Sequence, residues 1–320
     1  MRRTALPSRE STTLIDFGAQ TLRAYERSEG GELVAELGRV DEGLLPSREA
    51  FDRFIGSIRR RGFRATRAVA LAPRAGVVRR SLTLADNVRP SPEAYRTEMQ
   101  RAAAIEPGAF EFACCEIRMV RGVVPAQPGL ALPHEAGRAI RDLCEGGGIE
   151  LEAIYLHEFA LARLGTEADT CSVLVDAGVS GWTIVIAQEG RPRFFRFVRP
   201  SDSASVPTAA ARRVNAVRAR LGLEPSGADQ RVAEAIAAEI SRTTEYAERS
   251  LGVPPVTRLG LLGGPLCCSA VCAAVMDRLR ESGSRLEQVS VGLGVGESPA
   301  SAFAAIGRAV LGQPAEGVAA

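Results

Sequence analysis

Two stretches of the chain share one order of hydrophobic and polar positions. They are "TTLIDFGAQTLRAYERSEGGELVAEL" near the start and "CSVLVDAGVSGWTIVIAQEGRPRFFRF", which lies 160 residues further along. Each opens with an apolar, β-branched run ending in Asp-x-Gly, and each continues through a short polar turn into two more alternating runs. Alternation with a period of two is typical of strands. We therefore expect a duplicated unit of three strands, in two related lobes that face each other.

The remaining segments predict helices and strands in alternation. Residues 47–61 carry their apolar side chains on one helical face, with Ser47 as the N-cap. The stretch 77–118 predicts a strand, a helix and a strand, which we expect to form a small subdomain inserted in the first lobe. Further predicted elements are strands at 67–73, 151–156 and 287–291, helices at 209–221, 231–251 and 299–312, a helix from Glu158, and a strand, turn and helix within 256–283.

Composition excludes several classes of function. The chain has 320 residues, 46% of them hydrophobic, and 40 basic against 38 acidic residues, so no excess charge favours nucleic acid. All basic residues are Arg, which excludes Schiff-base chemistry and a Walker-type lysine. Arg79, Arg80, Arg59 to Arg61 and Arg64 are expected on a solvated face, and the alternative is a basic surface near the membrane. The seven Cys lack zinc-ligand spacing, and neither a secretory segment nor a membrane span is apparent, so we expect free thiols in the cytoplasm.

The repeated Asp-x-Gly suits phosphate and metal chemistry. Gly18 and Gly178 let the backbone turn so that successive N–H groups can point at a phosphate. Asp16 and Asp176, at the ends of their strands, can hold a hydrated Mg²⁺ through water. Two such loops on opposing lobes would clamp a nucleotide tail between them. The alternative is that both are ordinary turns.

Other polar residues give weaker signals. Glu158, at the start of a helix beside the expected cleft, can orient a water as a catalytic residue, or can simply complement the helix dipole. His134 and His157 are the only histidines, and they suit local packing or solvent contact rather than a catalytic dyad. Trp182 can stack on a base, but a Trp in a strand is more typical of the core of a sheet.

Several motifs occur together in one order. They are "TLIDFGAQTLRAY", "HEFALARL", "VLVDAGVSGWTIVI", "EISRTTEY", "LGLLGGP" and "SAFAAIGRAVL". In this order the chain resembles the two-lobed actin/Hsp70-type ATPases, and within them the PilM family of type IV pilus assembly proteins.

The resemblance implies an α/β, two-lobe, actin-like fold with duplicated ribonuclease H-like halves and a reduced subdomain in the second lobe. Lobe I would span 1–168, with an inserted subdomain at about 74–125, lobe II would span 169–298, and a C-terminal helix at 299–320 would return to lobe I. It implies ATP with Mg²⁺ as cofactors. The nucleotide-facing residues would be Asp16, Gly18, Ala19, Gln20, Asp176, Gly178, Val179, Ser180, Glu239, Arg242, Gly263 and Gly264.

The resemblance also implies a partner and a location. The chain would be a scaffold of a type IV pilus or type II secretion-like platform, at the inner face of the inner membrane. It would dock the short cytoplasmic tail of a membrane protein between lobe I and the 77–118 subdomain.

Two departures, a short 199–234 region without Lys and Pro265 in place of a third glycine, weigh against ATP. The alternatives are therefore a nucleotide-free scaffold of the general secretion type or, less in keeping with the insertion, a small-molecule kinase of the same fold.

Overall fold

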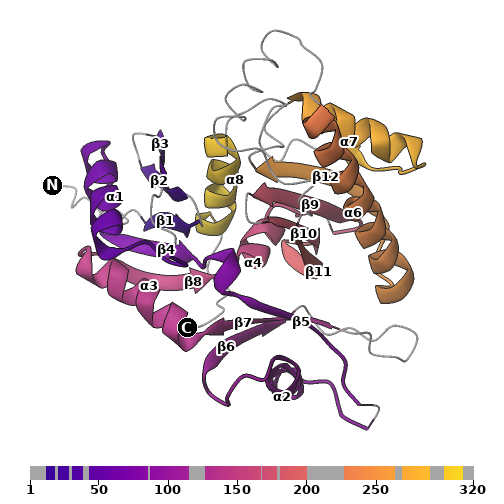
Figure 1. Cartoon of the computed structure of the whole chain (residues 1–320), viewed down its shortest axis with the longest axis horizontal. Helices are drawn as coiled ribbons and strands as arrows, with labels where there is room; N and C mark the ends of the chain where they lie inside the picture. The colour runs from indigo at the N-terminus through magenta and orange to yellow at the C-terminus, as the bar shows by residue number, and fades with distance from the viewer. Residues whose placement is uncertain are drawn as a thin grey trace, which may run out of the picture.

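The computed structural model describes eleven stretches of the chain: residues 12–18, 21–28, 31–38, 43–85, 87–114, 127–166, 168–178, 181–199, 227–263, 269–288 and 299–312. They form two lobes, each built on a five-stranded mixed sheet, with a smaller three-stranded subdomain attached to the first lobe (Figure 1). The predicted helix at 209–221 lies outside the described residues.

Lobe I has the strand order β3-β2-β1-β4-β8. Its strands are β1 (Thr12–Phe17), β2 (Thr21–Ser28), β3 (Gly31–Gly38), β4 (Arg67–Leu71) and β8 (Glu150–Tyr155). The helix α1 (Arg48–Arg60) begins as predicted at Ser47, whose side chain accepts a hydrogen bond from the Ala50 N–H at 3.2 Å. The helix α3 (His134–Gly146) packs beside β8.

Lobe II has the matching order β11-β10-β9-β12-β13. Its strands are β9 (Cys171–Gly178), β10 (Gly181–Gln188), β11 (Arg191–Val198), β12 (Val256–Gly263) and the short β13 (Glu287–Gln288). The helices α6 (Gly227–Leu251) and α7 (Ser269–Glu281) pack against each other beside this sheet.

The duplication predicted from the sequence is confirmed by strand pairing. In lobe I, β1 pairs antiparallel with β2 and parallel with β4. In lobe II, β9 pairs antiparallel with β10 and parallel with β12. Asp16 lies opposite Leu71 of its parallel neighbour, and Asp176 lies opposite Leu262, so both carboxylates stand at the same place in their sheets.

The inserted subdomain joins three antiparallel strands in the order β5-β7-β6. The strand β5 (Val78–Leu82) follows a short turn of 3₁₀ helix, η1 (Arg74–Gly76), and α2 (Pro92–Ala103) precedes β6 (Phe110–Cys114). The central strand β7 (Gln127–Pro133) leads directly into α3. The chain then passes through β8 into α4 (His157–Ala162), which contacts β10, β11 and the last helix, α8 (Pro299–Leu311).

Alternation along β9 divides lobe II between two cores. Val173, Val175 and Ala177 pack with the apolar faces of α6 and α7, and Trp182 lies in this cluster, as predicted. Leu174 instead joins the core cluster of lobe I. Since side chains two apart share a face, Asp176 points toward lobe I with Leu174. The helix α8 packs on β1, β2 and β3, where the Tyr25 ring lies against Gly307.

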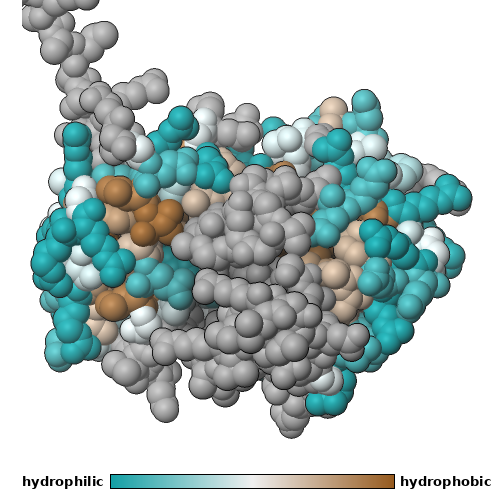
Figure 2. All heavy atoms as spheres, turned by 90° about the horizontal axis from the view of Figure 1, so that it is seen from above, coloured by the Kyte–Doolittle hydropathy of each residue, from teal (hydrophilic) through white to brown (hydrophobic). Residues whose placement is uncertain are grey.

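The described parts of the surface seen from above are mostly hydrophilic, with smaller hydrophobic areas among them (Figure 2). Among the described helices, none combines the length and hydrophobicity that a bilayer crossing demands. The described cysteines are Cys114, Cys144, Cys171 and Cys272, and all four are free thiols. Burial raises the pKa of Cys144 to about 12, which keeps it in the unreactive thiol form.

Candidate functional site

Asp16 and Asp176 both lie in the region where the lobes meet, and both are largely buried, at 9% and 5% exposed. Asp16 is held by its own sheet. Arg23, directly opposite on β2, places its Nη1 atom 3.7 Å from Asp16 Oδ2, while its Nε lies 3.4 Å from Glu36 on β3. Arg23 is therefore shared between two carboxylates, and its attraction to Asp16 is the looser of the two contacts.

Asp176 is held by residues from the other lobe. Arg74, in the turn η1 that follows β4, donates from Nη2 to Asp176 Oδ2, and its Nη1 lies 3.4 Å from the backbone oxygen of Asp176. His157 Nε2 lies 2.7 Å from the same Oδ2 and 2.7 Å from Arg74 Nη2. When Nε2 carries a proton, His157 donates it to the carboxylate. Two side chains from outside the lobe II sheet therefore converge on one carboxylate oxygen.

The surroundings of Asp176 hold it in the charged form. Burial by itself raises the pKa of this carboxyl group, because removal from water disfavours the charge. The Arg74 guanidinium, the hydrogen bond from His157 and the more distant Arg23 outweigh that cost, so the pKa lies below its usual range. The group is thus a carboxylate at neutral pH.

Glu158, the catalytic candidate, also has an arginine partner. It is 1% exposed, and its Oε1 accepts from Arg79 Nε at 2.7 Å. The Arg79 Nη1 atom donates to the backbone oxygens of Arg74 and Val77, at 2.7 and 2.8 Å. The guanidinium lies over the Phe197 ring, 4.8 Å from its centre. Arg79 is therefore enclosed rather than on the solvated face expected, while Arg80 is exposed.

The three described glycines of the site leave no room for side chains. A Cβ on Gly18 would lie 2.6 Å from the Thr21 backbone oxygen, and one on Gly263 would lie 2.3 Å from the Ala177 backbone oxygen. Gly263 also has a φ of +95°, which favours glycine. A Cβ on Gly178 would lie 2.9 Å from Arg74 Nη1. All three positions therefore require glycine, and at Gly178 the neighbouring atom is Arg74 Nη1.

The remaining candidates lie apart or outside the described residues. Glu239 and Arg242 pair with each other on α6, and Glu239 Oε2 also lies 3.3 Å from Arg196 Nη1 of β11. Their ion partners thus belong to lobe II and not to the cluster around Asp176. Ala19, Gln20, Val179, Ser180 and Gly264 lie outside the described residues, as do Pro265 and most of the 199–234 region.

The described residues around Asp176 do not fit a hydrated Mg²⁺ ion. A cation held through water by Asp176 needs its carboxylate oxygens to face open solvent. Oδ2 faces two nitrogen donors, and a guanidinium stands at the edge of the Asp-x-Gly turn. The described residues likewise contain no cluster of three or more His, Cys, Asp or Glu that could hold a metal.

A cavity of about 610 Å³ opens between the inserted subdomain and lobe I. The inserted subdomain and lobe I both contribute apolar residues to its lining. The lining also includes acidic and basic residues. The lining residues are Ile105, Gly108, Ala109, Glu111, Phe112, Ala113, Leu132, Pro133, His134, Glu135, Gly137, Arg138, Arg141, Ile154 and Leu156. His134 Nε2 lies 3.1 Å from Glu111 Oε1, so this histidine pairs locally at the surface, as expected. We call this cavity the subdomain groove.

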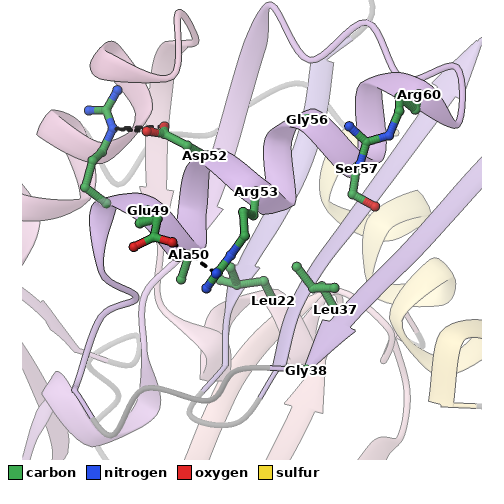
Figure 3. Close-up of a pocket in the computed structure, with 11 residues that line it drawn as sticks. Leu22, Leu37, Gly38, Glu49, Ala50, Asp52, Arg53, Gly56, Ser57 and Arg60 are labelled. Carbon is green, nitrogen blue, oxygen red and sulfur yellow. Dashed lines mark hydrogen bonds and ion pairs between the residues drawn. The ribbon is translucent and has the colours of Figure 1, made fainter.

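A second cavity, of about 910 Å³, runs beside α1 over the β2–β3 edge of the lobe I sheet (Figure 3). Leu22 and Leu37 line it together with the polar side of the helix. Its charges pair along α1, since Arg53 donates to Glu49 at 3.1 Å and Arg48 donates to Asp52 at 2.9 Å. Exposed pairs of this kind contribute little energy. Arg60 also lines the cavity, so its charged lining residues leave a net charge of +1.

No pattern in the sequence indicated Arg74. The sequence predicted a solvent-exposed Arg79, and local packing or solvent contact for His157. Arg74 lies 102 residues from Asp176 in the chain, and nothing local marks it except its place just after a buried strand and Pro73. The one signal that could have found it is the position itself. In a sheet of this order, a residue that follows the strand beside β1 reaches the same edge as the Asp-x-Gly turns.

No family model and no curated protein matches the chain. Among solved structures, a chain of the PilM–PilN type IV pilus biogenesis complex superposes with a TM-score of 0.67 at 19% identity, covering 95% of this chain and 99% of that one. The ethanolamine utilization protein EutJ from Carboxydothermus hydrogenoformans gives 0.48 at 12% identity, covering 93% and 90%. The cytoplasmic domain of EpsL, an inner-membrane component of the type II secretion system of Vibrio cholerae, gives 0.47 at 9% identity, covering 95% and 96%.

The likeness to the PilM–PilN structure confirms the α/β, actin-like fold expected from the sequence. The other two superpose less well, with TM-scores below 0.5.

Proposed function

We propose that this chain is a scaffold of a type IV pilus or related secretion platform, which docks the cytoplasmic tail of an inner-membrane protein in the subdomain groove. The observation that carries the proposal is the groove itself. It lies at the junction where the sequence resemblance predicts a docked peptide, and it is formed by the inserted subdomain on one side and by α3 and β8 on the other. The location at the inner face of the membrane belongs to the same proposal.

The lining suits a short peptide with apolar anchors. Phe112, Leu132, Ile154 and Leu156 offer apolar surface, which would take the side chains of such a tail. Arg138 and Arg141 of α3 stand beside Glu111 and Glu135, so charges at the rim can fix the direction of the peptide. The volume of about 610 Å³ holds a few side chains rather than a folded domain.

Two features of the cleft favour assembly over turnover. The catalytic candidate Glu158 is 1% exposed, and its Oε1 atom is paired with Arg79, so this oxygen is not available as a general base. The nucleotide is left out of this proposal because Arg74 and His157 already satisfy Asp176. Mg²⁺-ATP binding stays a prediction of the sequence, and so does the kinase alternative.

Gly137 offers a way to fill the groove without disturbing the fold. A Cβ there would meet one atom within 4 Å, the Ile154 Cδ1 at 3.9 Å, so the space beyond is open. Gly137→Leu also replaces a weak helix former in the middle of α3. The matched control is Gly56→Leu, a helical glycine that lines the α1 cavity and whose Cβ would meet only the end of Arg60.

The test measures how tightly the full chain binds synthetic peptides. These peptides carry the cytoplasmic segments of the host's inner-membrane pilus and secretion proteins. One of them should bind, and Gly137→Leu should weaken it about tenfold or more, a change of about 1.4 kcal/mol. Gly56→Leu should bind as the unmodified chain does. Failure of every peptide to bind, or equal binding by Gly137→Leu, would contradict the proposal.

A further inference from the structure

The contact between the lobes contains a cluster of paired charges. Arg74 and His157, both from the lobe I side, meet Asp176 of lobe II on one carboxylate oxygen. All three side chains are mostly buried, with 15%, 4% and 7% of their surfaces exposed. The contact thus joins two lobes whose sheets share no strand.

A second pair holds Arg74 in place. Arg79 of the inserted subdomain donates to the backbone oxygen of Arg74 while it is bound to Glu158. It also lies over Phe197 of β11, so it touches lobe II as well. Because His157 and Glu158 are neighbours at the start of α4, one short helix anchors both arginines. The turn η1 is therefore fixed from its backbone as well as from its side chain.

Arg74 occupies the place that a hydrated cation on Asp176 Oδ2 would need. Its Nη2 atom donates to that oxygen, and its Nη1 atom lies 2.9 Å from where a Cβ on Gly178 would stand. A positive charge in this place neutralises Asp176, as a bound cation would. A metal ion could reach Asp176 Oδ2 only after Arg74 had left, and Arg74 would then lose a buried, charge-assisted hydrogen bond.

We infer that Arg74 replaces a metal–nucleotide complex in this protein, by bridging the lobes through Asp176 and keeping the cleft closed without a ligand. Arg74 acts as a positioning residue, since it contacts no substrate. The inference is independent of the docking proposal, because neither Arg74 nor Asp176 lines the subdomain groove.

Hydrogen–deuterium exchange of the full chain tests this inference. The unmodified protein, Arg74→Ala and Arg80→Ala are compared in buffer with EDTA, and the unmodified protein is measured again with millimolar Mg²⁺-ATP. Arg80 is the matched control, because it lies next to Arg79 on β5 but is exposed and bonds only backbone oxygens.

In Arg74→Ala we expect the amides of β9 and α4 to exchange at least about tenfold faster, which corresponds to about 1.4 kcal/mol of lost local stability. Arg80→Ala should exchange like the unmodified protein, and Mg²⁺-ATP should leave the unmodified protein unchanged. Unaltered exchange in Arg74→Ala would overturn the inference. So would protection by Mg²⁺-ATP that Asp176→Asn abolishes.

A second variant covers the case in which Arg74→Ala fails to fold. The double variant Arg74→Ala/Asp176→Asn removes both charges, so no carboxylate is left buried without a partner. We expect it to fold with both sheets protected, and with faster exchange only where α4 and β9 meet. Native-like protection at that contact would overturn the inference.

Discussion

The two lobes carry the same strand unit, but they satisfy its aspartate in different ways. In lobe I the residue opposite Asp16 is Arg23, which belongs to the same sheet and lies 3.7 Å away. In lobe II the residue opposite Asp176 is Thr183, which has no charge, and the guanidinium comes from Arg74 in the other lobe. Asp16 is thus paired within its own lobe, while Asp176 is paired with a residue of the other lobe.

This difference shows what a duplicated unit determines and what it leaves open. The repeat sets the place of each carboxylate at the end of a central strand. The partner is set elsewhere, by the residue across the hairpin in one lobe and by a turn 102 residues away in the other. Energetic importance therefore follows from the partner and its burial rather than from the motif.

The largest expected difference is between Asp176→Ala and Asp16→Ala. Loss of Asp176 leaves Arg74 without its partner in a mostly buried place, which should cost about 3–5 kcal/mol of unfolding free energy. Loss of Asp16 should cost about 1 kcal/mol or less, because Arg23 keeps Glu36. Urea unfolding of both variants measures the two costs. Equal costs would mean that the two lobes do not differ in the way described.

Acid should reveal the same asymmetry. The depressed pKa of Asp176 stabilises the fold above the ordinary carboxyl range, and that stability is lost as the pH falls toward the folded-state pKa. Below about pH 4 the unmodified protein should lose up to about 1.4 kcal/mol per pH unit through this group, and Asp176→Asn should lose correspondingly less. Unfolding curves between pH 5 and pH 2 provide the measurement. An equal loss of unfolding free energy in the unmodified protein and in Asp176→Asn would contradict this explanation.

A smaller effect should couple Gly178 to Arg74. In Gly178→Ala the new Cβ would lie 2.9 Å from Arg74 Nη1, so the guanidinium must shift, at a cost of about 1–2 kcal/mol. In an Arg74→Ala background the same change should cost less, because only the Gly181 backbone oxygen, 3.3 Å from the new Cβ, still crowds it. Gly18→Ala is the comparison in lobe I, where the obstacle is the Thr21 backbone oxygen and no side-chain deletion should relieve it. Equal costs of Gly178→Ala in both backgrounds would exclude the contact.

The smallest effect concerns Tyr25, whose counterpart in the lobe II hairpin is Val185. Burial, and then the hydrogen bond to Glu32 at 3.1 Å, raise the pKa of Tyr25 to about 12. Tyr25→Phe should cost about 1 kcal/mol at neutral pH. A raised pKa stabilises the fold below pH 10, and this stability is lost as the pH rises toward 12, so Tyr25→Phe should escape that loss. Identical alkaline unfolding of both proteins would contradict the assignment.

Local patterns predicted much of the fold. The strand alternation, the Ser47 cap and the final helix all depend on neighbours within a few residues, and all are confirmed. The central strand β7 was missed, because Pro128, Gly129 and Pro133 are typical of a loop. Contacts made by the rest of the subdomain override that preference, since β7 lies between β5 and β6.

Only the part of the site that lies in the two repeated motifs could be predicted from the sequence. Asp16, Asp176 and their glycines follow from two similar motifs, and the structure places both carboxylates where the lobes meet. Arg74 and the roles of His157 and Glu158 depend on contacts between distant segments, for which one sequence holds no local signal. Adjacent residues of α4 take different arginine partners, a division that helical spacing alone does not specify.

The most direct test of the account is a double-mutant cycle on Arg74 and Asp176. Unfolding free energies are measured for the unmodified chain, Arg74→Ala, Asp176→Ala and the double variant, all in metal-free buffer. The account predicts a coupling energy of about 2–3 kcal/mol, because each single change leaves one buried charge without its partner and the double change removes both. A coupling energy near zero would show that these residues do not hold the lobes together.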